Sequence, residues 1–85
     1  MPRSRRSRYA SDYQTLLELL NERRQAAAIT QVELSERTGI SQSMLSKLER
    51  GVVRMDLADL LDYLDGIEDD PMAFLKAYLS RIDWA

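Results

Sequence analysis

The chain contains no cysteine and no histidine among its 85 residues. The absence of cysteine excludes a disulfide framework, a zinc site of the cysteine type and a thiol nucleophile. The absence of histidine removes the commonest general base and metal ligand. There are only three glycines, and no glycine-rich loop that could hold a phosphate is present. The sequence therefore indicates a binding protein, not an enzyme, and it predicts no cofactor and no metal site.

Long apolar runs are absent as well. No stretch approaches the roughly 18 apolar residues of a membrane span. The arginine-rich start at residues 1–8 is not followed by the apolar region of a signal peptide. We therefore expect a cytoplasmic protein with no membrane partner. Eighty-five residues, 45% of them hydrophobic, with two prolines and one phenylalanine, suit one small all-α domain.

Acidic and basic residues are unevenly distributed along the chain. Residues 1–54 hold ten basic and six acidic residues, a net charge of +4. Residues 55–85 hold two basic and eight acidic residues, a net charge of −6, and the whole chain carries −2. The local field at a binding surface matters more than the total charge. The first part of the chain can therefore approach phosphates, whereas the acidic second part is expected to stay away from them.

Two short helices joined by a tight turn are predicted at residues 30–51. Thr30 followed by Glu33 is a capping box, so a helix is expected from Gln31 to about Thr38. Gly39 can take the left-handed conformation that ends this helix. Ser41 can cap a second helix, expected at residues 42–50 and closed by a glycine at position 51. Apolar positions expected to face inward are Val32, Leu34, Ile40, Leu45 and Leu48.

The motif Thr-Gln-x-x-Leu-Ser-x-x-Thr-Gly-Ile-Ser-Gln-x-x-Leu-Ser-x-x-Glu-x-Gly occupies this stretch. It resembles the helix-turn-helix of the phage repressor and Cro family of regulators, also known as the XRE type. The resemblance is dense over residues 30–51 and weaker over about 13–64. It implies a compact five-helix domain of the lambda-repressor-like DNA-binding type over residues 11–85, with the helix-turn-helix at the second and third helices. Residues 1–10 are expected to form a flexible basic arm.

The predicted helix at residues 42–50 has the character of a recognition helix. Its outer face is short, polar and partly basic, and a major groove accepts one such helix. The residues expected to contact bases are Gln42, Ser43 and Lys47. The residues expected to contact phosphates are Gln31, Ser46, Arg50 and Arg54, together with Arg5, Arg6 and Arg8 of the arm. The resemblance further implies that Gln31 braces Gln42 and that an ion pair joins Arg24 to Glu49.

Three more helices are expected from capping signals and apolar stripes. A Ser-x-x-Gln box at positions 11–14 predicts a helix from residue 12 to about 27. An Asp-x-x-Asp pattern at 56–59 predicts a helix from Leu57 to Gly66, with an apolar stripe at Leu57, Leu60, Leu61 and Leu64. Asp70-Pro71 predicts a fifth helix to about residue 82, with a stripe at Leu75, Tyr78, Leu79 and Ile82.

More apolar surface is present than such a core requires, which indicates self-association. The loop after the recognition helix departs from the family, because two valines replace polar or basic residues and a methionine stands where proline is common. The expected dimer interface comprises Val52, Val53, Phe74, Tyr78 and Trp84. Aromatic side chains are enriched at such interfaces.

These patterns together predict a homodimeric regulator of transcription, acting as a repressor, that binds a palindromic operator in double-stranded DNA. Such a regulator would act by occluding a promoter or by contacting polymerase. One alternative is a DNA-binding antitoxin whose acidic half, residues 55–85, holds a basic toxin. Another is a helix-turn-helix used only for protein contacts. Neither alternative is an enzyme.

Overall fold

Five helices form the chain, and the computed structural model describes the backbone of residues 5–84 and the side chains of residues 11–84. They are α1 (Arg5–Ala26), α2 (Gln31–Thr38), α3 (Gln42–Glu49), α4 (Leu57–Gly66) and α5 (Pro71–Arg81). The described residues contain no strand, so the predicted all-α class is confirmed. Within this part of the chain, no helix combines the length and the apolar character that crossing a membrane requires.

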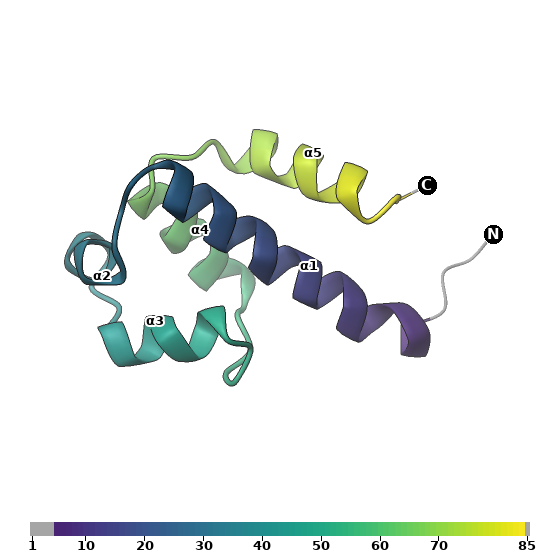
Figure 1. Cartoon of the computed structure of the whole chain (residues 1–85), viewed down its shortest axis with the longest axis horizontal. Helices are drawn as coiled ribbons and strands as arrows, with labels where there is room; N and C mark the ends of the chain where they lie inside the picture. The colour runs from purple at the N-terminus through teal and green to yellow at the C-terminus, as the bar shows by residue number, and fades with distance from the viewer. Residues whose placement is uncertain (1–4, 85) are drawn as a thin grey trace.

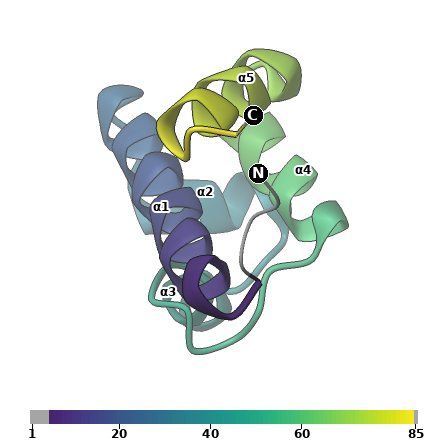
Figure 2. The same cartoon turned by 90° about the vertical axis from the view of Figure 1, so that its right-hand side faces the viewer.

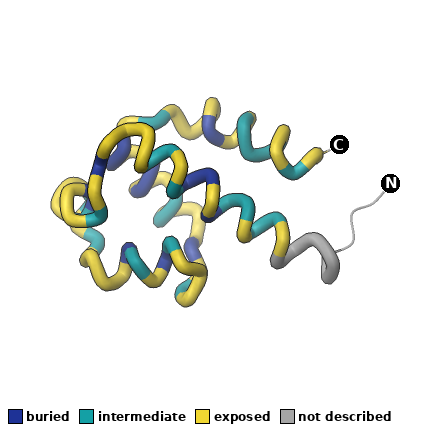
Figure 3. Tube along the Cα trace, in the orientation of Figure 1, coloured by how far each residue is buried: buried dark blue, intermediate teal, exposed yellow. Residues whose placement is uncertain are grey.

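The long first helix runs through the middle of the molecule, with α5 on one side and α3 on the other (Figure 1). The helix α2 packs against both α3 and α4, and α4 also contacts α5. One core lies between these elements (Figure 3). Its buried residues come from every helix and from three connections, and they are Leu19, Leu20, Ile29, Leu34, Leu45, Leu48, Met55, Tyr63, Leu64, Ile67 and Phe74.

Four helices follow their predicted bounds closely because local capping determines their ends. Thr30 and Glu33 form the predicted capping box of α2, and Asp56 and Asp59 form one at α4. The carboxylate of Asp70 accepts the Met72 N–H at 3.0 Å, with proline at the first position of α5. Each of these side chains satisfies a backbone N–H that the helix leaves without a partner.

The first helix begins earlier than predicted. It starts at Arg5, so the expected start at residue 12 is wrong, and residues 5–10 of the expected arm belong to α1. Ser11 lies inside the helix, where its carbonyl accepts a hydrogen bond from the Thr15 hydroxyl at 3.1 Å. Extending an existing helix adds one hydrogen bond for each residue fixed, so a serine that could cap a helix does not have to end it.

The predicted burial of α4 is only partly correct. Leu64 is buried and Leu60 is partly buried, but Leu57 and Leu61 are exposed. The helix is instead turned so that Tyr63 and Gly66 face the core. A Cβ atom on Gly66 would collide with Leu34 and would come within 2.8 Å of the Thr38 methyl group. The glycine therefore allows α2 and α4 to approach closely, and this approach determines which side of α4 is buried.

The predicted burial of the fifth helix is also only partly correct. Phe74 is buried, and Ala77 and Tyr78 pack partly against the core, whereas Leu75 and Met72 are exposed. These inward positions follow the i, i+3, i+4 spacing of one helix face. The single phenylalanine fills the core, so that Tyr78, Leu79 and Ile82 of the predicted stripe are only partly buried and Leu75 is exposed. Val32, which was expected to face inward from α2, is exposed too.

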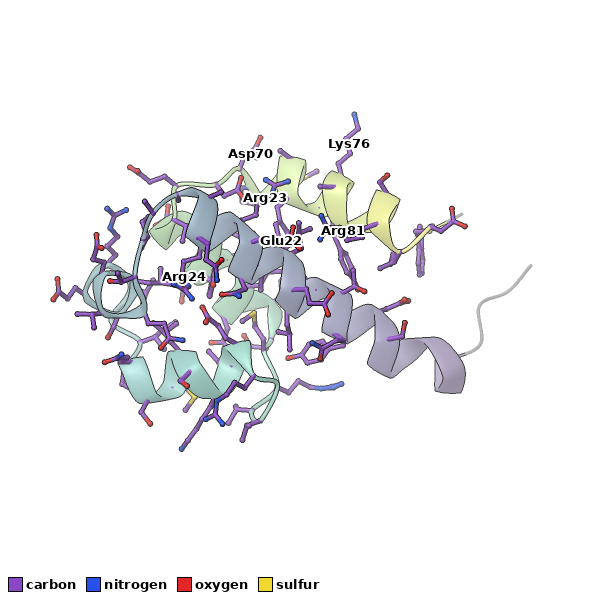
Figure 4. The ribbon with its side chains drawn as sticks, viewed as in Figure 1. Glu22, Arg23, Arg24, Asp70, Lys76 and Arg81 are labelled. Carbon is purple, nitrogen blue, oxygen red and sulfur yellow. The ribbon has the colours of Figure 1, made fainter. Side chains whose placement is uncertain are left out.

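Polar contacts join α5 to α1 above this core. The Tyr78 hydroxyl donates to the Asp12 carbonyl oxygen at 2.9 Å. Arg81 pairs with Glu22 at 2.9 Å, and Figure 4 shows these two side chains between the helices. These contacts fix α5 to the side of α1 that lies away from α3.

Candidate nucleic-acid interface

The connection between α2 and α3 is a short turn with glycine at its start. Gly39 has φ of 78°, and its N–H donates to the Ser35 carbonyl at 2.9 Å. That left-handed conformation is energetically unfavourable for a residue with a Cβ atom but not for glycine. Two residues later, the Ser41 hydroxyl accepts the Met44 N–H at 3.1 Å and begins α3. The predicted helix-turn-helix is therefore present, with α3 ending at Glu49, one residue earlier than expected.

The helix α3, which was predicted to be the recognition helix, has one buried side and one exposed side. Leu45 and Leu48 are fully covered by the core. Gln42, Ser43 and Lys47 are all exposed, and Ser43 and Lys47 are one helical turn apart. Figure 3 shows that much of α3 is exposed along the edge of the molecule. The three residues predicted to contact bases thus occupy the outer surface of a single short helix.

The carboxylate of Glu49 anchors the end of α3 to three other helices. Arg24 of α1 donates from Nε to Oε2 at 2.8 Å and from Nη2 to Oε1 at 3.2 Å. The amide of Gln31 of α2 donates to Oε1 at 2.8 Å. The hydroxyl of Tyr63 of α4 donates to Oε2 at 2.6 Å. The ion pair expected from the family resemblance is present, and the chain adds two donors to it.

Two neighbouring arginines have different roles because they point to different sides of α1 (Figure 4). Arg24 points toward the Glu49 cluster and also donates to the Ile29 carbonyl at 3.0 Å. Arg23 points toward α5, where it contacts the Asp69 carboxylate at 3.1 Å and lies over the Phe74 ring. Arg24 thereby sets the position of the recognition helix, whereas Arg23 holds the connection before α5.

Burial and hydrogen bonding act in opposite directions on the Glu49 cluster. Burial alone raises the pKa of Glu49, but the hydrogen bonds from Arg24, Tyr63 and Gln31 outweigh burial and lower it below 4.5. Burial lowers the pKa of Arg24, and its bonds to Glu49 reverse that effect and raise it. Burial, together with the bond to Glu49, raises the pKa of Tyr63. At neutral pH the cluster therefore holds a carboxylate, a guanidinium and a neutral phenol.

The position of Gln31 differs from the expected bracing contact. Its amide bonds Glu49, and no hydrogen bond to Gln42 is formed. An amide nitrogen carries two hydrogens, so the contact with Glu49 leaves one N–H for another acceptor. Gln31 also lies at the first position of α2, where backbone N–H groups face outward. Its predicted phosphate contact is compatible with this arrangement and stays a prediction.

Basic residues flank the end of α3 and the loop after it. Arg50 is exposed, and its Nε donates to the Ser46 hydroxyl at 3.2 Å. Arg54 lies over the Tyr13 ring, with its guanidinium carbon 5.1 Å from the ring centre. The Tyr13 hydroxyl also accepts the Met55 N–H at 2.8 Å. Tyr13 thus fixes the loop and one of its arginines against α1.

The anchoring tyrosines are the residues that the sequence analysis missed. Neither Tyr13 nor Tyr63 was assigned a role from the sequence. A hydroxyl on a residue at a core position is the one available signal, because a buried tyrosine usually finds a hydrogen-bond partner. The side chains of Arg5, Arg6 and Arg8 lie outside the described side chains, so their phosphate contacts stay predictions.

The expected dimer interface is contradicted in part. Phe74 is only 1% exposed, so its assignment to an interface is wrong, because the core of its own chain already covers it. Tyr78 and Val53 are partly covered by the same core, and the Tyr78 hydroxyl bonds α1. Val52 and Trp84 are exposed. The five residues therefore do not form one exposed surface.

The carboxylates do not gather into a metal centre. Over the described residues, no group of three or more acidic side chains is placed to hold a metal ion. The acids of α4 act in capping or lie at its surface, as Asp56 and Asp59 show.

Comparisons with known proteins point to the same motif as the geometry. A helix-turn-helix family model matches residues 20–65, which is more than half of the chain. A solved structure of an XRE-family like protein from Pseudomonas syringae pv. tomato str. DC3000 is 40% identical. That likeness covers 92% of this chain and 98% of the other, with a TM-score of 0.85. No curated protein matches the chain.

Proposed function

The chain belongs to the XRE-type family of helix-turn-helix regulators, which bind DNA, and on that premise we propose that it is a repressor that binds a palindromic operator as a homodimer. Each α3 would enter one major groove of the double helix. Two such helices related by a twofold axis require half-sites about one helical turn apart. With the operator inside a promoter, the bound dimer would exclude polymerase at the chromosome in the cytoplasm.

The anchoring of α3 is the observation that carries this proposal. A recognition helix has to keep its position while it exchanges contacts with water for contacts with bases. Glu49 ties the end of α3 to Arg24, Gln31 and Tyr63 at distances of 2.6–3.2 Å. Leu45 and Leu48 hold the inner side of the same helix in the core. The polar outer side is then presented to a partner on a rigid support.

Base contacts are proposed for Gln42, Ser43 and Lys47. An amide can bond adenine through two hydrogen bonds, and a lysine can bond guanine. A serine is short and can serve either a base or a phosphate. The side chains of Gln42, Ser43 and Lys47 are all exposed on α3, which supports this assignment.

Phosphate contacts are proposed for residues on both sides of α3. The N–H groups at the start of α2 and the second amide hydrogen of Gln31 would bond one phosphate. Arg50 and Arg54 would lie beside the opposite strand, and Ser46 would contribute through its hydroxyl. Such contacts fix the register of the protein on DNA and leave the reading of sequence to the bases.

A binding selection from genomic fragments at physiological salt tests this proposal. We expect recovery of one short palindrome, whose half-site spacing measures the separation of the two α3 helices. A matched variant, Gln42→Ala, should lose this enrichment and keep weak binding to random DNA. Recovery of random fragments that are released by modest salt would contradict specific recognition. Failure to bind any DNA at low salt would favour the alternative of a helix-turn-helix that contacts only protein.

A further inference from the structure

One apolar side chain interrupts the polar outer surface of α3. Four residues of this helix are exposed, namely Gln42, Ser43, Met44 and Lys47, and Met44 is the apolar one among them. Met44 is 39% exposed and does not belong to the buried core, which takes two leucines from the same helix. The base contacts proposed above use the three polar residues, so they leave Met44 without a role.

Met44 lies in the part of α3 that would come closest to the bases. The Ser41 hydroxyl accepts the Met44 N–H at 3.1 Å, so Met44 belongs to the first turn of the helix. The first residues of a recognition helix are the ones that contact base edges. Lys47 follows Met44 by three residues, a spacing that makes the two side chains neighbours on the surface of a helix. Met44 is therefore next to a residue that is itself proposed to contact a base.

The chemistry of an exposed methionine suits one group in the major groove. Every base pair presents hydrogen-bond donors or acceptors there, but only thymine presents a methyl group, at C5. Hydrogen bonds from Gln42 and Lys47 suit adenine and guanine, and they would not detect that methyl group. The methionine side chain is unbranched and adaptable, so it can cover an apolar group from more than one direction. Such a contact would remove apolar surface from water on the protein and on the base.

We propose that Met44 contacts the C5 methyl group of a thymine in each half-site and thereby determines specificity for thymine at that position. The contact rests on the proposed function, because it requires α3 to lie in a major groove. Cytosine has no methyl group at C5, so a T·A pair would be preferred to a C·G pair where Met44 lies. Met44 would then add an apolar contact to the hydrogen bonds that the polar residues of α3 make.

Replacement of thymine by deoxyuridine tests this contact. It removes the methyl group and leaves every hydrogen-bonding group of the base in place. The operator recovered from the fragment selection is synthesised with deoxyuridine at one thymine of one half-site at a time, and fluorescence anisotropy measures the affinity of the full chain. We expect one position at which the wild type loses about fourfold in affinity, which corresponds to the burial of one methyl group.

Substitutions of Met44 test whether this side chain causes the loss. Met44→Ala should bind the thymine operator more weakly than the wild type and should bind the thymine and deoxyuridine operators equally. Met44→Leu keeps an apolar side chain of similar volume, so it should retain the preference for thymine. The position is exposed, so both variants should fold.

Met72→Ala is the matched control, because it makes the same substitution at an exposed methionine far from the bases. Met72 is 71% exposed on α5. In Figures 1 and 2, α5 lies on the opposite side of the molecule from α3. The Met72→Ala variant should therefore keep the wild-type affinity for both operators.

Separate outcomes overturn the thymine contact and the proposed DNA function. If no thymine position shows a preference that Met44→Ala removes, Met44 does not contact a thymine methyl group. A half-site without thymine in either strand would overturn the contact as well. Both results would leave the recovered operator, and with it the proposed function, intact. Failure to recover any operator would reject the proposed function, and the thymine contact with it.

Discussion

The helices α3 and α5 present opposite kinds of surface from the same core. The outer side of α3 is polar except for Met44, which is 39% exposed, and it carries Lys47 without an exposed acid. The outer side of α5 is apolar at Met72 and Leu75. Both helices bury a similar apolar face, so the core alone does not distinguish them. The difference teaches that one core can support two surfaces of different chemistry, one suited to polar contacts and one suited to apolar contacts.

The support behind the two surfaces differs in the same way. Behind α3, the Glu49 carboxylate is bonded by three helices and is largely buried. Behind α5, the ion pair of Arg81 with Glu22 is exposed. Exposed pairs add little stability, whereas loss of one member of a buried pair leaves the other without compensation. The position of α3 thus rests on a buried polar cluster in addition to Leu45 and Leu48, whereas α5 is held by Phe74, by the hydrogen bond of Tyr78 and by an exposed ion pair.

The largest expected effect on stability is that of Glu49→Ala, which removes the support of α3. Removal of the carboxylate leaves Arg24, Gln31 and Tyr63 without their acceptor, so the free energy of unfolding should fall by about 3 kcal/mol. Urea unfolding measures this loss. The control is Glu22→Ala, which breaks the exposed pair with Arg81 and should cost far less. Equal losses in the two variants would contradict the anchoring role of Glu49.

The close approach of α2 and α4 can be tested with Gly66→Ala. The added methyl group would collide with Leu34 and Thr38, so α2 and α4 would have to separate. Overpacking of this kind costs about 2 kcal/mol, which urea unfolding would detect. The control is Asp65→Ala, which changes the exposed residue next to Gly66 and should have little effect on the free energy of unfolding. If Gly66→Ala proves as stable as the wild type, the close approach of α2 and α4 is not required for stability.

The reading of bases by α3 is tested with Gln42→Ala. We expect a loss of roughly 1–3 kcal/mol on the selected operator and little change on random DNA. Lys76→Ala, on the opposite side of the molecule, removes a charge without touching α3 and serves as the control. Titration of both DNA molecules by fluorescence anisotropy gives the two affinities. Equal losses on operator and random DNA would remove the base-reading role of Gln42.

Acid should weaken the support of α3 reversibly. Because the folded pKa of Glu49 lies below the unfolded value of 4.5, its stabilisation is complete above pH 4.5 and is lost as pH falls through the folded pKa. The difference in unfolding free energy between wild type and Glu49→Gln should therefore shrink below pH 4.5. Urea unfolding of both proteins over a range of pH measures it. A difference that stays constant into acid would contradict the lowered pKa.

The smallest expected effect is that of Arg54→Ala. Loss of one phosphate contact should weaken operator and random DNA alike and reduce the salt slope by about one unit. Arg54 also lies over Tyr13, so circular dichroism should verify that the fold is retained. Affinities at several salt concentrations give the slope. A loss confined to the operator would assign Arg54 to base reading instead.

Local chemistry explains which parts of the fold were predictable. The bounds of α2 and α4, and those of α3 and α5 to within one residue, follow from caps that lie within three residues of the helix start. The start of α1 was predicted too late because Ser11 lies in a capping sequence. In the structure the helix continues through Ser11 toward the N-terminus, so this serine does not act as the cap. The exposed positions of Gln42, Ser43 and Lys47 followed from the apolar spacing of Leu45 and Leu48, which only one orientation of α3 can bury.

The amino-acid sequence by itself determined the five helices, the turn at Gly39 and the polar outer side of α3, because caps, glycines and apolar spacing act over a few residues. Only the tertiary structure decided which faces of α4 and α5 are buried. Those helices have apolar residues on more than one side. Contacts between residues distant in the sequence, Gly66 with Leu34 and Tyr63 with Glu49, determine which side is buried. The same packing leaves an apolar hollow between α4 and α5 at the surface.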